Sequence, residues 1–387
     1  MNKFNTLFGQ ILALVKRSDF EKLVKQEKAD RNFKHFSAWK QFVVMLFAQF
    51  SGQNGLRSIE NSFNAQRNTF YHLGITDREI KRTTLAYANE HRSSEFFEKL
   101  FYQLLEKVPR NNQKKCAFKN PFYAVDATVI GLCMNTFPWA KFRTTKAGIK
   151  LNTKLDLRTN IPSVVTISNA QNHENATLGE MRLKENDIVV FDRGYTNYHQ
   201  YASFCNTNIW FVSPLKANAD YEVLNEIRVT DKKIVCDEVI QMTGFAAVKN
   251  DLPLLRNIVV YDEENKRKLS LLTNIMDAEA CDVAQMYKQR WQIELFFKAI
   301  KQNLKIKTFY GTSENAVKTQ IWIALISFLL FRILRSKASA GIHNFTHFMS
   351  EFAVVLFQRR DLYLWFKRKP DYSPPPVTRD SKQILLF

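Results

Sequence analysis

Four side chains of complementary chemistry recur at helical spacing in the last third of the chain. Tyr287, Arg290, Glu294 and Lys301 are separated by three, four and seven residues. At about 100° per residue they lie at roughly 0°, 300°, 340° and 320° around a helix, in a stripe about 60° wide. A carboxylate flanked by two cations suits chemistry on a phosphate group. An exposed, salt-bridged helix face is the structural alternative, because Arg290 and Glu294 form an i,i+4 pair worth about 0.2 to 0.5 kcal/mol.

Two aspartates occupy positions that favour a ligand site. Asp126 lies inside the strand-like stretch from Phe122 to Thr128, where Asp is normally disfavoured. Asp192 ends the apolar run Ile188 to Phe191, and ligands in open α/β sheets bind beyond the carboxyl ends of strands. Capping a turn is the structural alternative for either residue.

The surroundings of these acids are strongly basic. The 387 residues include 56 Lys plus Arg against 37 Asp plus Glu, a formal charge of +19 that indicates a polyanionic partner. Glu294 is the only acid between Tyr287 and Tyr310, and Asp156 is the only one between Trp139 and Arg158. Clustered carboxylates raise each other's pKa unless a cation neutralises them. Oxygen ligands of this kind favour Mg²⁺, with Mn²⁺ as a substitute.

The elements that position these acids are predicted to form an α/β fold. We expect a mixed sheet with helices on both faces, interrupted by a β-rich insertion and preceded by an all-helical domain. One helix over Ala278 to Leu304 would carry Glu294, and strands are predicted at Val235 to Ile240, Phe245 to Val248, Asn257 to Tyr261 and Leu269 to Thr273. The predicted divisions are 1–115 (helical, for DNA binding or assembly), 116–215 (first part of the core), 216–275 (insertion), 276–340 (Glu-bearing helix and end of the core) and 341–387 (helical region and extended tail).

Cysteine spacing and hydropathy exclude several other classes. The five cysteines lie at least 17 residues apart, which excludes a CxxC zinc or redox motif and argues against a disulfide framework. The longest apolar run, Ile321 to Phe331, is shorter than the roughly 20 residues of a membrane span. We therefore expect a soluble, cytoplasmic protein with no membrane partner. Its excess of basic residues leads us to expect association with the nucleoid.

These motifs resemble one family of enzymes. Asp126 in Tyr-Ala-Val-Asp-Ala-Thr, Asp192 in Asp-Arg-Gly-Tyr, and the signature Tyr-x2-Arg-x3-Glu-x6-Lys are similar to the DDE transposases of insertion-sequence family four. The resemblance covers about residues 20 to 335. Asp192 follows Asp126 by 66 residues and Glu294 follows 102 later, which leaves room for the insertion that this family places before the Glu-bearing helix.

The resemblance implies an RNase H-like core in which Asp126, Asp192 and Glu294 hold two divalent ions, Mg²⁺ or Mn²⁺. Such a site cuts transposon ends and joins them to target DNA by two-metal phosphoryl transfer. Tyr287, Arg290 and Lys301 would contact phosphates near the transposon end. The implied partners are double-stranded DNA, at terminal inverted repeats and target sites, and a second copy of the chain in a homodimer on DNA.

Other residues are weaker candidates for the same site. Arg193 and Tyr195 follow Asp192 directly, and we expect them to contact DNA. Lys146 and Lys150, placed just before the second strand, could also contact DNA, although solvated lysines are common. His173-Glu174 resembles a His-acid pair that follows the third strand in relatives, and a helix N-terminal cap is the structural alternative.

Two readings remain open beside an active transposase, and the route of excision is open as well. An RNase H-like nuclease would cleave without strand transfer. An inactive or domesticated transposase would act only as a DNA-binding protein, and would be expected to have lost one of the three acids, all of which are present. Excision through a DNA hairpin, as in related enzymes, uses an aromatic residue that stacks on a flipped base. The insertion offers only Trp210 at its start and Phe245 within it, so the excision route stays open.

Overall fold

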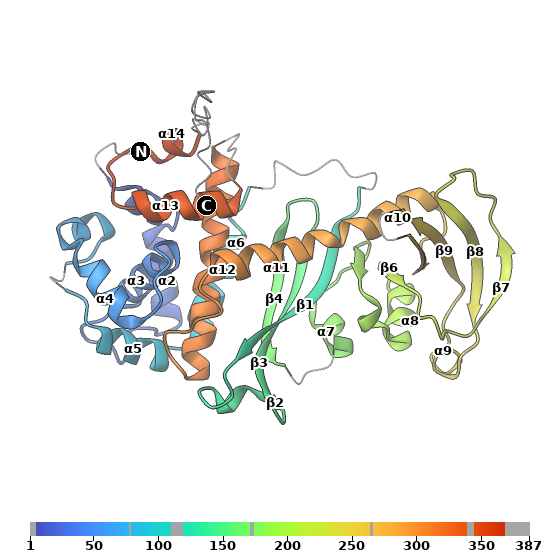
Figure 1. Cartoon of the computed structure of the whole chain (residues 1–387), viewed down its shortest axis with the longest axis horizontal. Helices are drawn as coiled ribbons and strands as arrows, with labels where there is room; N and C mark the ends of the chain where they lie inside the picture. Colours follow the sequence, from blue (N-terminus) through green and yellow to red (C-terminus); the bar gives the residue numbers. More distant parts are fainter. Residues whose placement is uncertain are drawn as a thin grey trace, which may run out of the picture.

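The computed structural model describes residues 5–76, 79–109, 119–170, 174–263, 266–338 and 344–367. The molecule is elongated (Figure 1), with a body of helices at one end, a sheet in the middle, and further strands at the other end. The extended tail predicted at the end of the chain falls outside the described residues.

The central sheet is mixed, as the sequence predicts. β1 (Phe122–Leu132) pairs antiparallel with β3 (Lys146–Asp156), and β3 pairs antiparallel with β4 (Ile161–Asn169). On its other side β1 is parallel to β5 (Ile188–Phe191), which is parallel to β6 (Trp210–Pro214). The resulting order β4-β3-β1-β5-β6, with β3 reversed, is that of an RNase H-like core.

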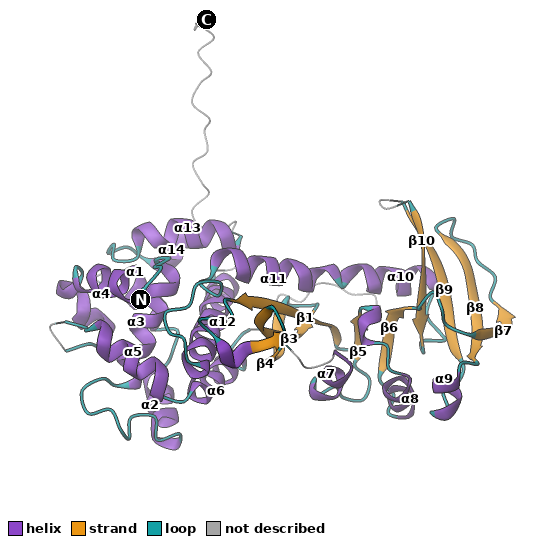
Figure 2. Cartoon of the chain, turned by 60° about the horizontal axis from the view of Figure 1, so that its bottom comes forward, coloured by secondary structure: helices purple, strands orange, loops and turns teal. Residues whose placement is uncertain are grey.

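Helices cover both faces of this sheet (Figure 2), in agreement with the predicted fold class. One face carries α10 (Ala280–Gln289) and α11 (Trp291–Asn303), and the other carries α7 (Glu174–Glu180) and α8 (Tyr198–Asn206). Two short elements precede β3, the 3-10 turn η2 (Pro138–Ala140) and β2 (Lys141–Arg143). β3 begins at Lys146, so Lys146 and Lys150 lie within the strand and not before it.

The insertion continues the central sheet. β10 (Arg267–Thr273) pairs antiparallel with β6, and β9, β8 and β7 follow outward to give ten strands. These outer strands are β7 (Tyr221–Glu226), β8 (Ile234–Met242) and β9 (Leu255–Asp262). The strand expected at Phe245 to Val248 is wrong, because the segment forms the short helix α9 (Phe245–Lys249). Extended Gly244 caps this helix, and the Asn250 side chain donates to the Ala246 carbonyl in its last turn.

Helices from both ends of the chain pack together in one body. α12 (Glu314–Lys337) packs on α3, α5 and α6, and the Leu7 and Phe8 backbone amides donate to the carbonyls of Gln358 and Leu356. α13 also packs on α3, and α14 packs on α1. The helices of this body are α1 (Leu7–Leu12), α2 (Arg17–Gln26), α3 (Ala38–Phe50), α4 (Leu56–Asn64), η1 (Arg67–Leu73), α5 (Arg82–His91), α6 (Ser94–Leu105), α12, α13 (Phe345–Val355) and α14 (Leu362–Lys367).

α12 is the one described helix long and apolar enough to cross a membrane by length and composition. The protein buries 89% of its most apolar window, so the helix serves as the hydrophobic centre of the helical body. A helix that is apolar all round is typical of such a buried position.

Candidate active site

The sheet register places two of the three predicted acids next to each other. Val125 of β1 is paired with Phe191 of β5 in the parallel ladder, and Asp126 and Asp192 are the residues that follow. Neighbouring strands lie about 4.8 Å apart. Asp126, within β1, and Asp192, directly after β5, therefore lie next to each other. β5 ends there, and the 3-10 turn η3 (Arg193–Tyr195) follows Asp192.

Glu294 reaches the same edge from the helix layer above the sheet. The predicted single helix is interrupted once, at Arg290, which ends α10 and begins α11 while keeping helical dihedral angles. The Arg290 amide donates to the Tyr287 carbonyl at 3.0 Å, which tightens the junction. Glu294 lies in the first turn of α11, where the helix dipole favours a negative charge.

Arg290 joins two of the acids. One guanidinium nitrogen lies 2.6 Å from Glu294 Oε1, and the other lies 3.6 Å from Asp126 Oδ2. The side chains of Arg290, Asp126 and Glu294 are 16%, 21% and 33% exposed, so the bridge is largely shielded from water. The i,i+4 pair expected from the sequence is therefore present, and it is part of a three-residue cluster.

Asp126 has the most perturbed carboxylate in this cluster. Its pKa is raised to about 6, chiefly by burial and in smaller part by the charges of Glu294 and Asp192, while the Ala127 amide and Arg290 oppose the rise. The Ala127 amide donates to Asp126 Oδ1 at 2.8 Å. The charges of Glu294 and Asp192 therefore both act on the Asp126 carboxylate, as expected of acids that lie close together.

The other two residues of the stripe face the same region. Burial raises the pKa of Tyr287, and the ring lies 5.8 Å from the Arg290 guanidinium carbon. Lys301 donates from Nζ to the Val129 carbonyl of β1 at 3.1 Å, and its pKa is lowered by burial and by Lys307. Arg290 and Lys301 thus contact β1, and Tyr287 lies near Arg290 and the charges of Asp192 and Arg193.

The donor chemistry of the site fits a hard divalent cation, since carboxylate oxygens are the ligands that Mg²⁺ and Mn²⁺ prefer. In the described part of the chain, no three His, Cys, Asp or Glu side chains converge closely enough to ligate one ion. Asp126 and Glu294 instead share the Arg290 guanidinium. The carboxylates of Asp126 and Glu294 thus both face the positive charge of Arg290. A divalent metal ion that takes the place of this guanidinium could be bound by the same two carboxylates.

The remaining predicted contacts fall in different surroundings. Arg193 is exposed beside Asp192, and Lys146 is exposed at the start of β3. Lys150 is buried within β3, opposite Val129. Tyr195 is only 1% exposed and packs against Phe191 in the core beneath α8, so its ring contributes to packing. His173 and the Glu174 side chain lie outside the described residues.

A structural anchor of the site is not evident from the sequence. Arg256 of β9 forms a buried ion pair with Asp237 of β8 at 2.6 Å. Its other guanidinium nitrogen donates to the carbonyls of Ile275, Met276 and Ala278, directly before α10. The insertion thereby holds the start of the helix pair that carries Arg290 and Glu294. In the sequence, Arg256 is recognisable only as an arginine two residues before the apolar run Ile258 to Val260, which does not indicate its partners.

Comparison with protein families identifies the class that this fold and site define. The family described as transposase DDE domain matches residues 117–330, more than half of the chain. The chain belongs to this family of transposases. Residues 3–76 match a second family, described as a domain of unknown function.

Individual relatives agree with this assignment. The chain is 28% identical over 244 residues to a probable transposase for an insertion sequence element of Geobacillus stearothermophilus, covering 62% of this chain and 63% of that protein. It is 28% identical over 298 residues to a putative transposase of Sinorhizobium fredii, covering 75% of this chain and 81% of the relative. A transposase for insertion sequence element IS4 of Escherichia coli is 23% identical over 51% of this chain and 46% of its own.

One solved structure aligns along most of the chain. It is the piggyBac transposase synaptic complex with hairpin DNA, with a TM-score of 0.45 and 10% identity over 96% of this chain and 83% of that one.

Proposed function

We propose that this transposase cuts the ends of an insertion sequence and joins them to target DNA, with Asp126, Asp192 and Glu294 as its catalytic acids. The observation that carries the proposal is the register of β1 and β5. It sets Asp126 beside Asp192 at the sheet edge that Glu294 also reaches. The family match and the relatives from insertion sequence elements support the choice of substrate.

Asp126, Asp192 and Glu294 would hold two Mg²⁺ ions, or Mn²⁺ as a substitute. Bound there, the ions would lower the pKa of an attacking water or 3′ hydroxyl and stabilise the leaving oxygen. The acids keep their negative charge near the DNA backbone only while cations compensate it, and Arg290 provides that compensation in the structure described above. When a phosphate approaches, Arg290 would exchange its carboxylate partners for the phosphate oxygens, which a guanidinium binds with two parallel hydrogen bonds.

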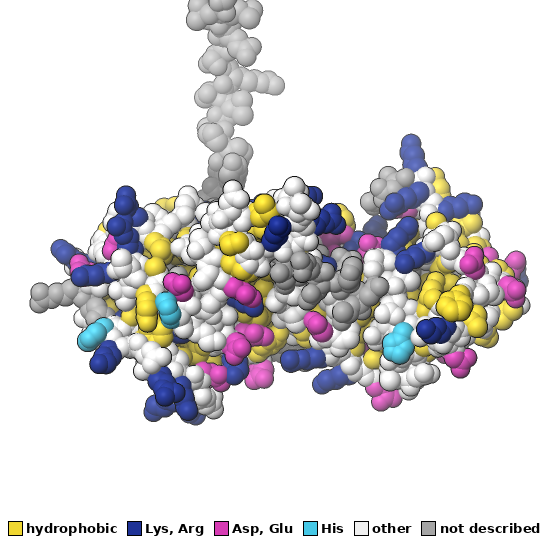
Figure 3. All heavy atoms as spheres, turned by 90° about the horizontal axis from the view of Figure 1, so that it is seen from below, with side chains coloured by type: hydrophobic (Ala, Val, Ile, Leu, Met, Phe, Trp, Pro, Cys, Tyr) yellow, Lys and Arg dark blue, Asp and Glu magenta, His cyan; other side chains and the backbone are white. Residues whose placement is uncertain are grey.

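The other cations near the site would position the DNA. Tyr287 and Lys301 flank Arg290 and Glu294 on the same helix stripe, while Arg193 is exposed beside Asp192 and Lys146 lies on β3. On the face that Figure 3 shows, Lys and Arg side chains lie over both the helical body and the insertion. Phosphate contacts of this kind fix the register of a duplex without reading its sequence. Two ends must be cut in concert, and a homodimer on DNA is the proposed working form.

The test is to incubate the purified protein and Mg²⁺ with a plasmid that carries its gene and native flanking DNA, and then to map every broken and joined end. Breaks at paired inverted repeats followed by joining to new sites are expected. Asp192→Ala should abolish them, whereas Asp220→Ala, an exposed aspartate of the insertion, should not. Breaks without joining would identify a nuclease, and tight binding without breaks would identify a DNA-binding protein.

A further inference from the structure

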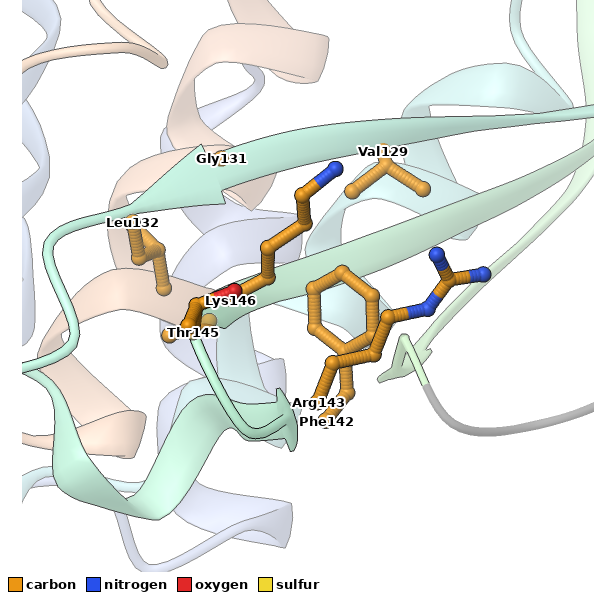
Figure 4. Close-up of a pocket in the computed structure, with 8 residues that line it drawn as sticks. Val129, Gly131, Leu132, Phe142, Arg143, Thr145 and Lys146 are labelled. Atoms are coloured by element: carbon orange, nitrogen blue, oxygen red, sulfur yellow. The ribbon is translucent and has the colours of Figure 1, made fainter.

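A pocket of about 500 Å³ opens at the far end of β1, near the candidate active site (Figure 4). Val129, Gly131 and Leu132 of β1 form one side of it, and Phe142, Arg143 and Lys146 form the other. Val129 follows Asp126 by three residues, so the pocket begins about 10 Å along the strand from the acids. None of these six residues is part of the acid cluster described above.

Glycines on facing strands create the hollow. Gly131 of β1 is paired with Gly148 of β3, so neither strand places a side chain at this point of the sheet. A Cβ added at Gly131 would meet no atom within 4 Å. A Cβ added at Gly148 would lie 3.3 Å from the Phe142 ring and 3.1 Å from Val129 Cγ1. Gly148 therefore lets Phe142 and Val129 close over β3 as an apolar wall, and Gly131 leaves the space in front of it open.

Cations surround this apolar wall. Figure 4 shows the Phe142 ring between the side chains of Lys146 and Arg143, and the Arg143 guanidinium carbon lies 6.0 Å from the ring centroid. Lys301 donates to the Val129 carbonyl on the same strand. No acidic residue occurs in the sequence between Asp126 and Asp156. A half-exposed aromatic ring with arginine and lysine beside it combines stacking and charge, the two features with which proteins bind single-stranded nucleic acid.

A DNA strand bound at the acids could reach the pocket by passing around the edge of β1 that β5 leaves unpaired. β5 pairs with β1 only as far as Val125, and in the described sheet no strand pairs with that edge of β1 beyond this point. Successive side chains alternate between faces, so Val129 and Gly131 face away from the helix that carries Glu294, whereas Asp126 faces toward it. A DNA strand that passes the acids and Lys301 can cross this edge and reach the pocket on the other face.

We propose that the pocket between β1 and the start of β3 binds one unpaired nucleotide of the DNA strand, with its base on Phe142 and its phosphates on Arg143 and Lys146. The inference rests on the proposed function, because it takes DNA as the substrate. It adds a second DNA subsite, on the face of β1 opposite to the acids, and assigns a role to Lys146 that its position within β3 supports.

Gly131→Leu tests the inference, because Gly131 lines the pocket and a Cβ added there meets no atom within 4 Å. Gly179→Leu is the matched control, since Gly179 lines a separate hollow between α7 and α8 and its added Cβ would approach only Gln200, at 4.0 Å. Fluorescence anisotropy with a single-stranded oligonucleotide of about 20 nucleotides should show that Gly131→Leu weakens binding roughly tenfold. Affinity for a duplex of equal length should change less than about twofold. The control should match the wild type in both measurements.

A second variant and a crosslink keep the test decisive if Gly131→Leu folds poorly. Phe142→Ala should weaken single-strand binding to a similar degree, and an oligonucleotide containing 5-iodouracil should crosslink to the peptide that holds Phe142. Unchanged single-strand affinity in a folded Gly131→Leu or Phe142→Ala protein, or crosslinks only elsewhere, would overturn the inference. If Lys146→Gln weakens binding and Phe142→Ala does not, the rim binds phosphate alone and the base pocket is wrong. Failure of the wild type to bind any DNA would instead contradict the proposed function.

Discussion

Replacing Arg290 with glutamine should make the protein bind Mn²⁺ more tightly in the absence of DNA. Arg290 holds Glu294 at 2.6 Å and lies 3.6 Å from Asp126, so a metal ion that uses these carboxylates must displace the guanidinium. Glutamine keeps much of the volume and a hydrogen-bond donor but removes the competing charge. The variant should nevertheless cut DNA more slowly, because it loses its phosphate contact.

The expected increase in Mn²⁺ affinity is set by the Arg290–Glu294 hydrogen bond, which the metal ion does not have to break in the variant. A hydrogen bond to a charged group contributes about 1.5 to 3 kcal/mol, which corresponds to roughly 10- to 100-fold in a binding constant. The side chains are 16% to 33% exposed, and water screens the pair in part, so the lower end is expected. We therefore expect Arg290→Gln to bind Mn²⁺ about tenfold more tightly.

Electron paramagnetic resonance of free Mn²⁺, titrated with protein at constant pH and ionic strength, measures this affinity directly. Lys288→Gln is the matched control, because it removes one exposed positive charge two residues away. Its affinity should stay within about twofold of the wild type. In the double variant with Glu294→Gln the gain should disappear. Equal or weaker Mn²⁺ binding by Arg290→Gln would refute the view that the guanidinium occupies the place of a cation.

Three further predictions address the acids, the DNA contact and the buried lysine of β3. Asp192→Ala should abolish cleavage and leave DNA affinity, measured by anisotropy, nearly intact; cleavage at the wild-type rate would exclude Asp192 as a catalytic acid. Lys301→Ala should reduce the slope of log K against log salt by about one, and an unchanged slope would indicate a solvated lysine. Burial lowers the pKa of Lys154 from 10.5 to about 8, with its ammonium 4.6 Å from the Tyr123 ring centroid. Between pH about 8 and 10.5 Lys154 is protonated in the unfolded chain but largely neutral in the folded protein. The free energy of unfolding therefore rises with pH in this range. Relative to Lys154→Met, the wild type should gain about 2 to 3 kcal/mol of unfolding free energy from pH about 7.5 to 10, as measured by urea denaturation, and a pH-independent difference would contradict the burial of a charge.

Much of the core could be predicted because its signals are local. The strand-like stretch from Phe122 to Thr128 lies within β1, and the apolar run Ile188 to Phe191 coincides with β5. The stripe of Tyr287, Arg290, Glu294 and Lys301 survives the break at Arg290, because this residue keeps helical dihedral angles. Phe245 to Val248 was predicted wrongly, because four apolar residues have the same pattern in a short helix and in a strand.

Other features depend on contacts between distant parts of the chain. α12 and α13 pack on α3, although more than 250 residues separate them from it in the sequence, and no local pattern predicts this contact. Tyr195 looked like a neighbour of DNA because it follows Asp192, but the turn η3 directs its ring into the core. The hollow beside Phe142 requires Gly131 and Gly148 to be opposite each other, which depends on the register of β1 and β3.

The sequence by itself determined the chemical inventory of this protein: three acids, a basic setting, and a helix that presents Arg290 and Glu294 on one face. These follow from residue identity and from the period of a helix, both of which are local. Only the tertiary structure decided that Asp126 is adjacent to Asp192, that Arg290 lies between Asp126 and Glu294, and that the first and last helices form one body. Each of these depends on strand register or helix packing, which are fixed when distant segments bury their apolar surfaces together.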